Sequence, residues 1–464
     1  MNAPQELVEA ALAASTADGC IVIVADHSET NLRWAANSLT TNGQMQSRSM
    51  TVIATFERSD GTRAGVVTRA ITAIEQVEDM VRAAEAIGRD STPSDDASPL
   101  VEPYEHSDNW SADSTKTSVS VFDTFAPALG GAFERWRGDD RLLFGFAEHE
   151  ITSYFLGTST GLRRRFDQPQ GRLELNGKAA DLSSSAWSGA HSRDFTDIDV
   201  TSAADALEQR LGWAGTRLDL PPGRYETILP PSAVADLMIY AYWTASARDA
   251  DEGRSVYSSG SGGTRIGEQL SPLPLTLRSD PSAPGLECEP FQVVTASYGG
   301  LESVFDNGLP VTATNWIDQG RLADLVRTRS WAAKSGGNAQ GFTSNLILDG
   351  SPDGTGPSLA EMIEATERGL LLTCLWYIRE VDPQTLLLTG LTRDGVYLVE
   401  DGKVRGAVNN FRFNESPIDL LSRLTEVSAT EPTLSREWSD YFKRTAMPAI
   451  RVPDFNMSTV SQAS

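Results

Sequence analysis

The stretch PPGRYETILPPSAVADLMIYAYWTASARDADEGRSVY, residues 221–257, decides how this sequence is organised. Its first part, Tyr225 to Leu229, is rich in β-forming residues and ends at Pro230 and Pro231. Ser232 is then placed to cap a helix that carries apolar side chains towards Ala247. The stretch therefore predicts a strand, a stop and a largely apolar helix.

The sequence changes character across this stretch. Mixed segments with polar linkers precede it, whereas short strands and glycine-rich turns with one or two helices follow it. With 464 residues, of which 40% are hydrophobic, the chain can bury a large core and is expected to form two domains. We expect an α/β (α+β) fold with an N-terminal mixed sheet and helices over residues 1–220, and a C-terminal β-rich antiparallel sheet or barrel-like domain over residues 221–464.

In the first half, the clearest local signal is the turn at Asp60 and Gly61, which predicts a hairpin between strands 49–57 and 63–70. A gap containing Asn42 and Gly43 is expected before the first of these strands. Residues 89–117 are rich in Ser, Asp, Pro and Thr, and predict a solvated polar excursion. Helical periodicity is expected over residues 5–14, 71–87, 119–136 and 203–211.

The charge balance restricts the partners. The chain has 39 Lys and Arg against 63 Asp and Glu, a formal net charge of -24 and a pI near 4.6. Such a surface repels phosphate backbones and anionic membranes, so we expect neither nucleic acid nor membrane as a partner. The sequence has no apolar run of membrane-spanning length, and its first residues lack the features of a signal peptide, so we expect a cytoplasmic protein.

Metal-binding side chains are scarce. The second half contains no histidine, because all four precede residue 192: His27, His106, His149 and His191. A zinc helix of the HExxH type therefore cannot exist there. Three distant cysteines, Cys20, Cys288 and Cys374, offer neither a disulfide framework nor a CxxC site, and are expected to be buried thiols. We expect no metal ligand and no cofactor in this chain.

One segment fits a catalytic motif. Residues 157–161, GTSTG, match the GxSxG pattern around a nucleophilic serine, Ser159. That motif requires a helix after the turn, whereas the following residues indicate strands, so the segment is interpreted as a hairpin turn. The glycine-rich residues 260–267 lack the Walker lysine, and the carboxylates at 249–252 are interpreted as solvated charge at a polar helix end.

Several stretches, in order, resemble the TldD/PmbA family of metallopeptidases. They are NLRWAANSLTTNGQMQSRSMTVIATFERSDGTRAGVVTRA (31–70), YFLGTSTGLRRRF (154–166), VFDNGLPVT (304–312), GFTSNLILDG (341–350), ERGLLLT (367–373) and GVYLVEDGKVRGAV (395–408). Each motif is weak alone, but the ordered set spans nearly the whole chain. The resemblance implies a two-domain protein that works in a TldD/TldE pair to degrade or trim peptides.

In that family, the TldD-type subunit binds zinc on a helical HExxxH motif and carries a late cysteine. The equivalent helix here, Ala233 to Ala247, has neither His nor Glu, and the late segment 435–455 has no cysteine. The chain therefore resembles the TldE (PmbA) type. The resemblance implies a metal-free subunit, with zinc and catalysis supplied by the HExxxH-bearing paralogue.

The expected partners are this TldD-type paralogue, in a hetero-oligomer, and unfolded peptide, with self-association left open. We expect no catalytic residue in this chain. Peptide could be held by β-augmentation at an exposed strand edge, which reads backbone more than sequence. Loop composition and aromatic content suggest substrate-binding residues in three stretches: Ser258, Gly262, Gly337, Asn338, Trp376, Tyr377 and Arg379.

Two other functions remain open at this point. The chain could be an independent hydrolase without a metal, using Ser159 or Cys374 as nucleophile. It could also be a non-catalytic scaffold, or a maturation factor for natural products derived from peptides. Activity of the chain alone would favour the first alternative, and a partner that is not a peptidase would favour the second.

Overall fold

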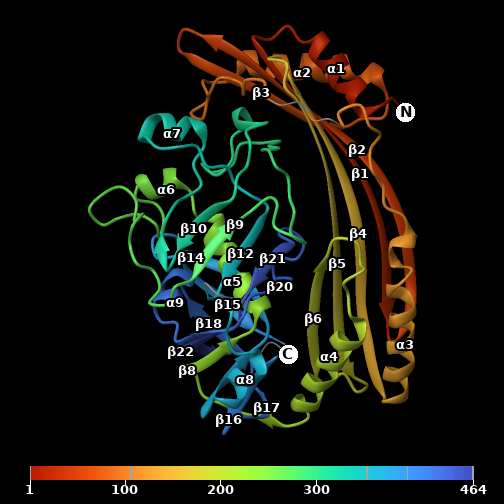
Figure 1. Ribbon diagram of the computed structural model, residues 1–464, viewed down its shortest axis with the longest axis vertical. Coiled ribbons are helices and arrows are strands. Elements are labelled where there is room, and N and C mark those ends of the chain that lie inside the picture. Colours follow the sequence, from red (N-terminus) through yellow and green to blue (C-terminus); the bar gives the residue numbers. More distant parts are fainter. Residues whose placement is uncertain (1, 105–106, 108, 352–353, 394, 462–464) are drawn as a thin grey trace.

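A computed structural model describes residues 2–104, 107, 109–351, 354–393 and 395–461. His106 and a small part of the predicted excursion lie outside these residues. The described residues form three β-sheets with helices packed on them, which confirms the predicted α/β class (Figure 1). The predicted domain boundary near residue 220 remains a prediction.

The first sheet is a long antiparallel wall in the order β3-β2-β1-β4-β5-β6 (Figure 1). Its strands are β1 (Gly19–Ala35), β2 (Ser38–Arg58), β3 (Gly61–Ala70), β4 (Arg141–Thr158), β5 (Arg163–Ala179) and β6 (Ser185–Ser192). The predicted turn at Asp60 and Gly61 is confirmed, since β2 ends and β3 begins there.

The gap predicted at Asn42 and Gly43 is wrong, because both residues pair inside β2. The chain turns earlier, at Ala36 and Asn37, where φ is 46° and 61°. Two positive φ values match the right-handed twist of a hairpin. The buried Asn37 side chain fixes this turn by donating to the Arg141 carbonyl and accepting from the Leu143 amide, at 2.7 Å each.

Side-chain alternation gives the first sheet two buried faces. Val22 and Val24 of β1 pack against the helices, whereas Ile21 and Ile23 pack against the second half of the chain. Four helices cover the outer face (Figure 1). They are α1 (Pro4–Ala14), α2 (Val77–Asp90), α3 (Phe125–Gly138) and α4 (Val200–Ala214). The other side, here called the inner face, therefore turns towards the second half.

The predicted polar excursion contains no helix or strand in its described residues from 91 to 117, but it is not simply solvated. The Thr117 amide donates to Ser28 of β1 at 3.0 Å, and Thr115 bonds to Ser153 of β4 at 3.0 Å. The Tyr104 hydroxyl donates to the Gly308 carbonyl at 2.7 Å. The segment therefore ties the first sheet to the second half.

The helix predicted after the two prolines is α5 (Pro231–Trp243), which follows β8 (Gly223–Leu229). Pro230 occupies the N-cap position and Pro231 begins the helix, so the capping role predicted for Ser232 is wrong. Proline suits the first helical position because no helical partner exists there for an amide hydrogen.

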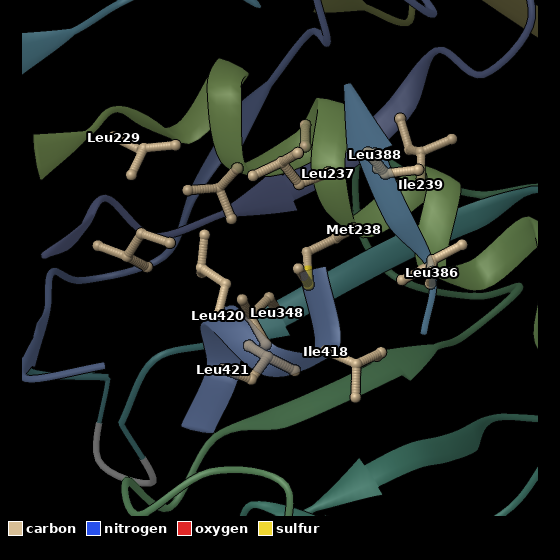
Figure 2. Close-up of a cluster of buried hydrophobic side chains, with 14 of the residues drawn as sticks. Leu229, Leu237, Met238, Ile239, Leu348, Leu386, Leu388, Ile418, Leu420 and Leu421 are labelled. Carbon is tan, nitrogen blue, oxygen red and sulfur yellow. The ribbon is translucent and has the colours of Figure 1, made fainter. Parts of the chain in front are cut away.

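Ten of the thirteen residues of α5 are buried, so the helix runs through the core of the second half. Figure 2 shows Met238 of α5 directed towards Leu348 of β12 (Asn345–Asp349) and Ile418 of α9 (Pro417–Ser422). Sheets and helices from many parts of the second half therefore pack around this one helix.

The second half contains the other two sheets. The second sheet has the order β11-β10-β9-β12-β21-β20, and its remaining strands are β9 (Thr276–Ser279), β10 (Thr314–Asp318), β11 (Arg321–Leu322), β20 (Glu431–Thr433) and β21 (Arg444–Met447). The third sheet has the order β14-β15-β18-β22-β8-β13-β16-β17-β7, with β19 paired to β22. As far as the described residues reach, both sheets are open at their edges, so the β-rich half is not a closed barrel.

The third sheet is mostly antiparallel, with parallel pairs only between β13 and β8 and between β17 and β7 in the described part. Its remaining strands are β7 (Arg217–Leu218), β13 (Arg368–Leu372), β14 (Leu375–Asp382), β15 (Leu387–Thr392), β16 (Val396–Glu400), β17 (Lys403–Val408), β18 (Phe411–Glu415), β19 (Glu426–Val427) and β22 (Ile450–Val460). Short helices complete the half: α6 (Ala247–Asp251), α7 (Arg329–Ser335) and α8 (Leu359–Glu364). Among the described helices, none has the length and apolarity needed to cross a membrane.

Candidate functional site

A buried carboxyl group links α5 to residues 435–442, here called the late loop. Asp236 of α5 is fully buried, and its Oδ1 accepts the Glu437 amide at 2.8 Å. Its backbone carbonyl accepts the Trp438 indole at 2.9 Å, whereas its Oδ2 has no hydrogen-bond partner among the described residues. Burial raises the pKa of Asp236 well above its ordinary value, so the neutral acid is favoured.

The late loop also holds the edge strand β14. The Glu437 carboxylate accepts the amides of Tyr377 and Ile378 at 3.1 Å each, and Arg379 lies 3.4 Å away. Tyr377 has a φ of 51°, a left-handed conformation that these two hydrogen bonds hold in place. Burial raises the pKa of Glu437, although the amides and Arg379 oppose that shift. The edge strand and the late loop therefore form one fixed unit.

Aromatic rings fill the space between α5 and the late loop. Tyr240 and Trp243 of α5 lie 5.6 Å and 5.1 Å from Trp438, measured between ring centroids. Arg436 stacks on Trp376 of β14 at 4.3 Å. The helix therefore offers the late loop one carboxyl group and aromatic rings. A zinc site needs about three nitrogen, sulfur or oxygen ligands, so this set does not fit one.

A cleft lies between the inner face of the first sheet and the second half. It consists of two cavities of about 350 Å³ and 260 Å³, which share the lining residues Tyr154, Glu289, Phe342 and Ser344. Alternation along β4 places Glu150, Thr152 and Tyr154 on this side. Residues 440–444, which run from the end of the late loop to the first residue of β21, form the opposite wall of the larger cavity.

The basic groups of the cleft are already paired. Lys443 Nζ lies 2.7 Å from Glu150 Oε1, and Arg444 donates to Gln170 and to the Ser344 carbonyl. Burial acts to raise the pKa of Glu150, but Lys443 and Gln170 outweigh it and leave that pKa lowered. The carboxylate is therefore ionised and neutralises the ammonium group.

The nearby His191 of β6 stays neutral at ordinary pH. Burial lowers its pKa to about 3, helped by the charges of Arg444 and Lys443. His149 is buried on the other side of the sheet, where its ring contacts the Thr117 hydroxyl at 2.6 Å and the Arg193 carbonyl at 2.8 Å. Within the described chain, no three His, Cys, Asp or Glu side chains come close enough together to hold a metal ion.

The seven residues predicted to bind substrate occupy three separate places. Trp376, Tyr377 and Arg379 come together on β14 beside Glu437. Ser258 and Gly262 lie in the loop that follows α6, and Gly337 and Asn338 lie after α7, where the Asn338 carbonyl accepts from Arg327 at 3.1 Å. None of the seven lines the two cavities of the cleft, and their role remains a prediction.

The cleft residues were missed because they come from distant segments: β4, β5, Trp243 of α5, residues 289–311, residues 342–344 and residues 440–444. One signal was present in the sequence. The alternation of Glu148, Glu150, Thr152 and Tyr154 indicates a polar face on a long strand. Nothing in the sequence places Glu289 or Lys443 opposite that face.

The candidate nucleophiles lie outside the cleft. Gly157 to Gly161 is a hairpin turn between β4 and β5, as predicted, and Ser159 Oγ accepts the Cys20 amide at 3.0 Å. The three cysteines are buried, as predicted. Burial raises the pKa of Cys20 to about 11 and that of Cys288 to about 12, which disfavours the reactive thiolate.

Comparisons with known proteins agree with this architecture. A sequence model described as the PmbA/TldA metallopeptidase C-terminal domain matches residues 222–459, just over half of the chain. A search of curated proteins gave no match. The chain belongs to the PmbA/TldD family, as the sequence motifs predicted.

Three solved structures share the whole fold. TldE from Thermococcus kodakarensis is 18% identical, with a TM-score of 0.77 over 97% of this chain and 99% of that chain. A proposed modulator of a DNA gyrase from Thermotoga maritima is 17% identical, with a TM-score of 0.76 over 97% and 99%. A proposed modulator of DNA gyrase from Bacteroides thetaiotaomicron is 13% identical, with a TM-score of 0.76 over 98% of each chain. At such low sequence identities, the structural likeness shows a shared fold and nothing more.

Proposed function

We propose that this chain is the TldE-type subunit of a peptidase pair, and that a TldD-type paralogue with an HExxxH helix supplies zinc and catalysis. The composition of α5 carries this proposal. The helix presents Asp236, Tyr240 and Trp243 to the late loop, and these side chains bond or pack there instead of converging on a metal. The likeness to TldE over 97% of the chain supports the proposal.

In this proposal, the chain contributes a peptide-binding surface to a cytoplasmic complex. The cleft offers two adjoining cavities between the two halves. The edge strand β14 offers backbone for β-augmentation outside Tyr377 and Ile378, whose amides Glu437 already binds. The substrate is an unfolded peptide, because an extended backbone can follow both features. Two structural relatives are described as proposed gyrase modulators, and we do not extend that description to this chain.

The test is reconstitution from purified subunits. The chain is assayed for zinc content and for cleavage of an unfolded fluorogenic polypeptide, first alone and then mixed with its HExxxH-bearing paralogue. We expect the chain alone to be free of zinc and inert, and the mixture to bind about one zinc per pair and to cleave. A paralogue with both HExxxH histidines replaced by alanine is the matched control, and its mixture should not cleave.

The same experiment separates the alternatives. Cleavage by the chain alone, abolished by Ser159→Ala or Cys374→Ala, would establish an independent hydrolase and overturn the proposal. A stable complex that contains no peptidase subunit would instead indicate a scaffold or maturation factor. Size-exclusion chromatography of the chain alone measures its self-association in the same series.

A further inference from the structure

Acceptor atoms without donors gather along the cleft. Gln168 of β5 is only 4% exposed, and its amide nitrogen donates to the carbonyls of Pro169 and Glu287 at 3.1 Å each. The Gln168 Oε1 atom is buried and has no hydrogen-bond donor among the described residues. Buried polar atoms are nearly always paired in folded proteins, so an unpaired acceptor at a cavity wall indicates a missing donor.

Glu289 adds a second acceptor at the centre of the cleft, where it lines both cavities. Its Oε2 atom is also buried without a hydrogen bond to any described residue. The nearest cation, Arg444, has its Nη2 3.8 Å from this oxygen, which is too far for a hydrogen bond. Arg444 uses its other nitrogens on Gln170 and Ser344.

The charge of the cleft is unbalanced. Among the described residues, four carboxylates line the two cavities against two cations, Lys443 and Arg444, and the carboxylates are Glu150, Glu289, Glu302 and Asp440. Lys443 pairs with Glu150, and Asp440 pairs with Arg172. Arg444 Nη2 lies 3.8 Å from Glu289 and balances part of its charge, whereas Glu302 forms no ion pair with any described residue. Burial, and after it the charge of Glu289, raises the pKa of Glu302.

Aromatic rings complete the walls. Tyr154 and Phe342 line both cavities, beside Glu289. The faces of such rings attract ammonium and guanidinium groups, most strongly where water is excluded. Carboxylate, amide oxygen and aromatic ring together form the usual surroundings of an organic cation.

We propose that this cleft is a subsite for a cationic group of a peptide, an ammonium or guanidinium bound at Glu289, which lines both cavities, with Glu302 in the smaller cavity and Gln168 in the larger one. The inference rests on the proposed peptide-binding function and names the substrate class: peptides with a basic side chain or a free amino terminus in reach of the cleft. Such a group supplies several N–H donors and a positive charge, which are the two things the cleft lacks. An acidic group would be repelled by the carboxylates of Glu289 and Glu302.

The experiment measures peptide binding to the chain alone by calorimetry. Two short peptides, acetylated and amidated, differ only at the central residue, lysine in one and norleucine in the other. Hydrogen bonds to charged groups are stronger than those between neutral groups, so we expect the lysine peptide to bind at least about tenfold more tightly. Equal affinities, or no binding of either peptide at about 1 mM, would overturn the subsite.

Variants test the assignment to these residues. Glu289→Gln and Glu302→Gln, singly and together, keep the side-chain shape and remove the charge, and should reduce the preference for lysine to less than about twofold in the double variant. Glu364→Gln makes the same chemical change on α8, outside the cleft, and should leave the preference intact. Thermal unfolding establishes that each variant is folded, and a single variant serves where the double variant is not. A folded Glu289→Gln variant with full preference contradicts the proposal.

Further peptides distinguish the source of the cation. An arginine peptide tests the guanidinium, and a peptide with a free amino terminus and no basic residue tests the terminal ammonium. The assay needs no partner and no zinc, so it separates the two proposals. Preference for a cation without cleavage by the reconstituted pair would overturn the proposed function alone, and cleavage without preference would overturn the subsite alone.

Discussion

At the scale of single residues, the buried Asp236 predicts how the stability of the protein depends on pH. Burial raises its pKa, so the native state retains this proton over a pH range in which the unfolded chain has lost it. The native state then binds more protons than the unfolded state, and the contribution of this group to stability falls as the pH rises from about 4 towards the raised pKa. Asp236→Asn removes this titration and keeps the shape of the side chain.

We therefore expect Asp236→Asn to gain stability relative to the native protein as the pH rises from 5 to 8. Denaturant unfolding at several pH values measures the difference, and Asp79→Asn, exposed on α2, is the control. Asp236→Ala should lose about 1 to 3 kcal/mol at pH 5, because it leaves the Glu437 amide without its acceptor. This deficit should shrink as the pH rises, because alanine also removes the titration. A constant difference between Asp236→Asn and native protein across this range would contradict the raised pKa.

Few of the individual residues of this site could be predicted from the sequence. It correctly excluded imidazole from α5 and predicted that the cysteines are buried. It could not pair Asp236 with Glu437, because 201 positions separate them and no spacing rule links them. The loop composition that drew attention to Gly262 and Gly337 reflects positive φ angles of 94° and 98°, which glycine adopts at no steric cost.

At the scale of elements, local sequence signals predicted the structure correctly where the backbone conformation itself requires particular residue types. Two prolines stop β8 and begin α5, and the turn at Asp60 and Gly61 joins β2 to β3. The turn at Ala36 and Asn37 was missed because alanine rarely adopts a positive φ. The side chain of Asn37 holds that turn by hydrogen bonds to the start of β4. These bonds join residues about a hundred positions apart, so a local sequence pattern cannot predict them.

The contact between β3 and α2 gives a prediction at this scale. A Cβ atom on Gly65 would lie 2.0 Å from the Ala84 carbonyl oxygen and 2.3 Å from the Gly88 amide nitrogen. Gly65→Ala must therefore push α2 away from the sheet, and we expect a loss of at least about 1 to 3 kcal/mol in chemical denaturation.

Gly212→Ala is the matched control for this substitution. Gly212 lies within α4, and a Cβ atom there would meet nothing within 4 Å. We expect this variant to gain about 0.5 to 1 kcal/mol, because alanine loses less backbone entropy in a helix. Equal effects of the two substitutions would show that α2 does not pack on β3 as closely as described.

At the scale of the whole molecule, charged groups join the inner face of the first sheet to the second half. Arg172 of β5 is almost buried and contacts Asp440, with Glu148 at 3.5 Å and Glu174 at 3.6 Å. Arg172→Met would remove this guanidinium group, although Lys443 stays 3.4 Å from Glu148 and Arg436 stays 3.4 Å from Glu174. We expect a loss of about 1 to 3 kcal/mol, measured by denaturant unfolding, that changes little with salt.

Arg135→Met is the control for this interface. Arg135 of α3 also contacts two carboxylates, Asp205 at 2.8 Å and Glu208 at 3.0 Å, but its side chain is 36% exposed. Because solvent screens such a pair, we expect a loss below about 1 kcal/mol that shrinks further at high salt. A loss for Arg172→Met no larger than this would mean that the interface does not depend on its buried charges.

The position of β22 in the third sheet affects how the chain is made. This strand, residues 450–460, lies between β18 and β8, although β8 leaves the ribosome more than two hundred residues earlier. At typical synthesis rates, roughly tens of seconds pass before the two parts of the sheet can join. During that time the nascent protein exposes unpaired strand edges, which are the surfaces that chaperones cover and that cause aggregation when left bare.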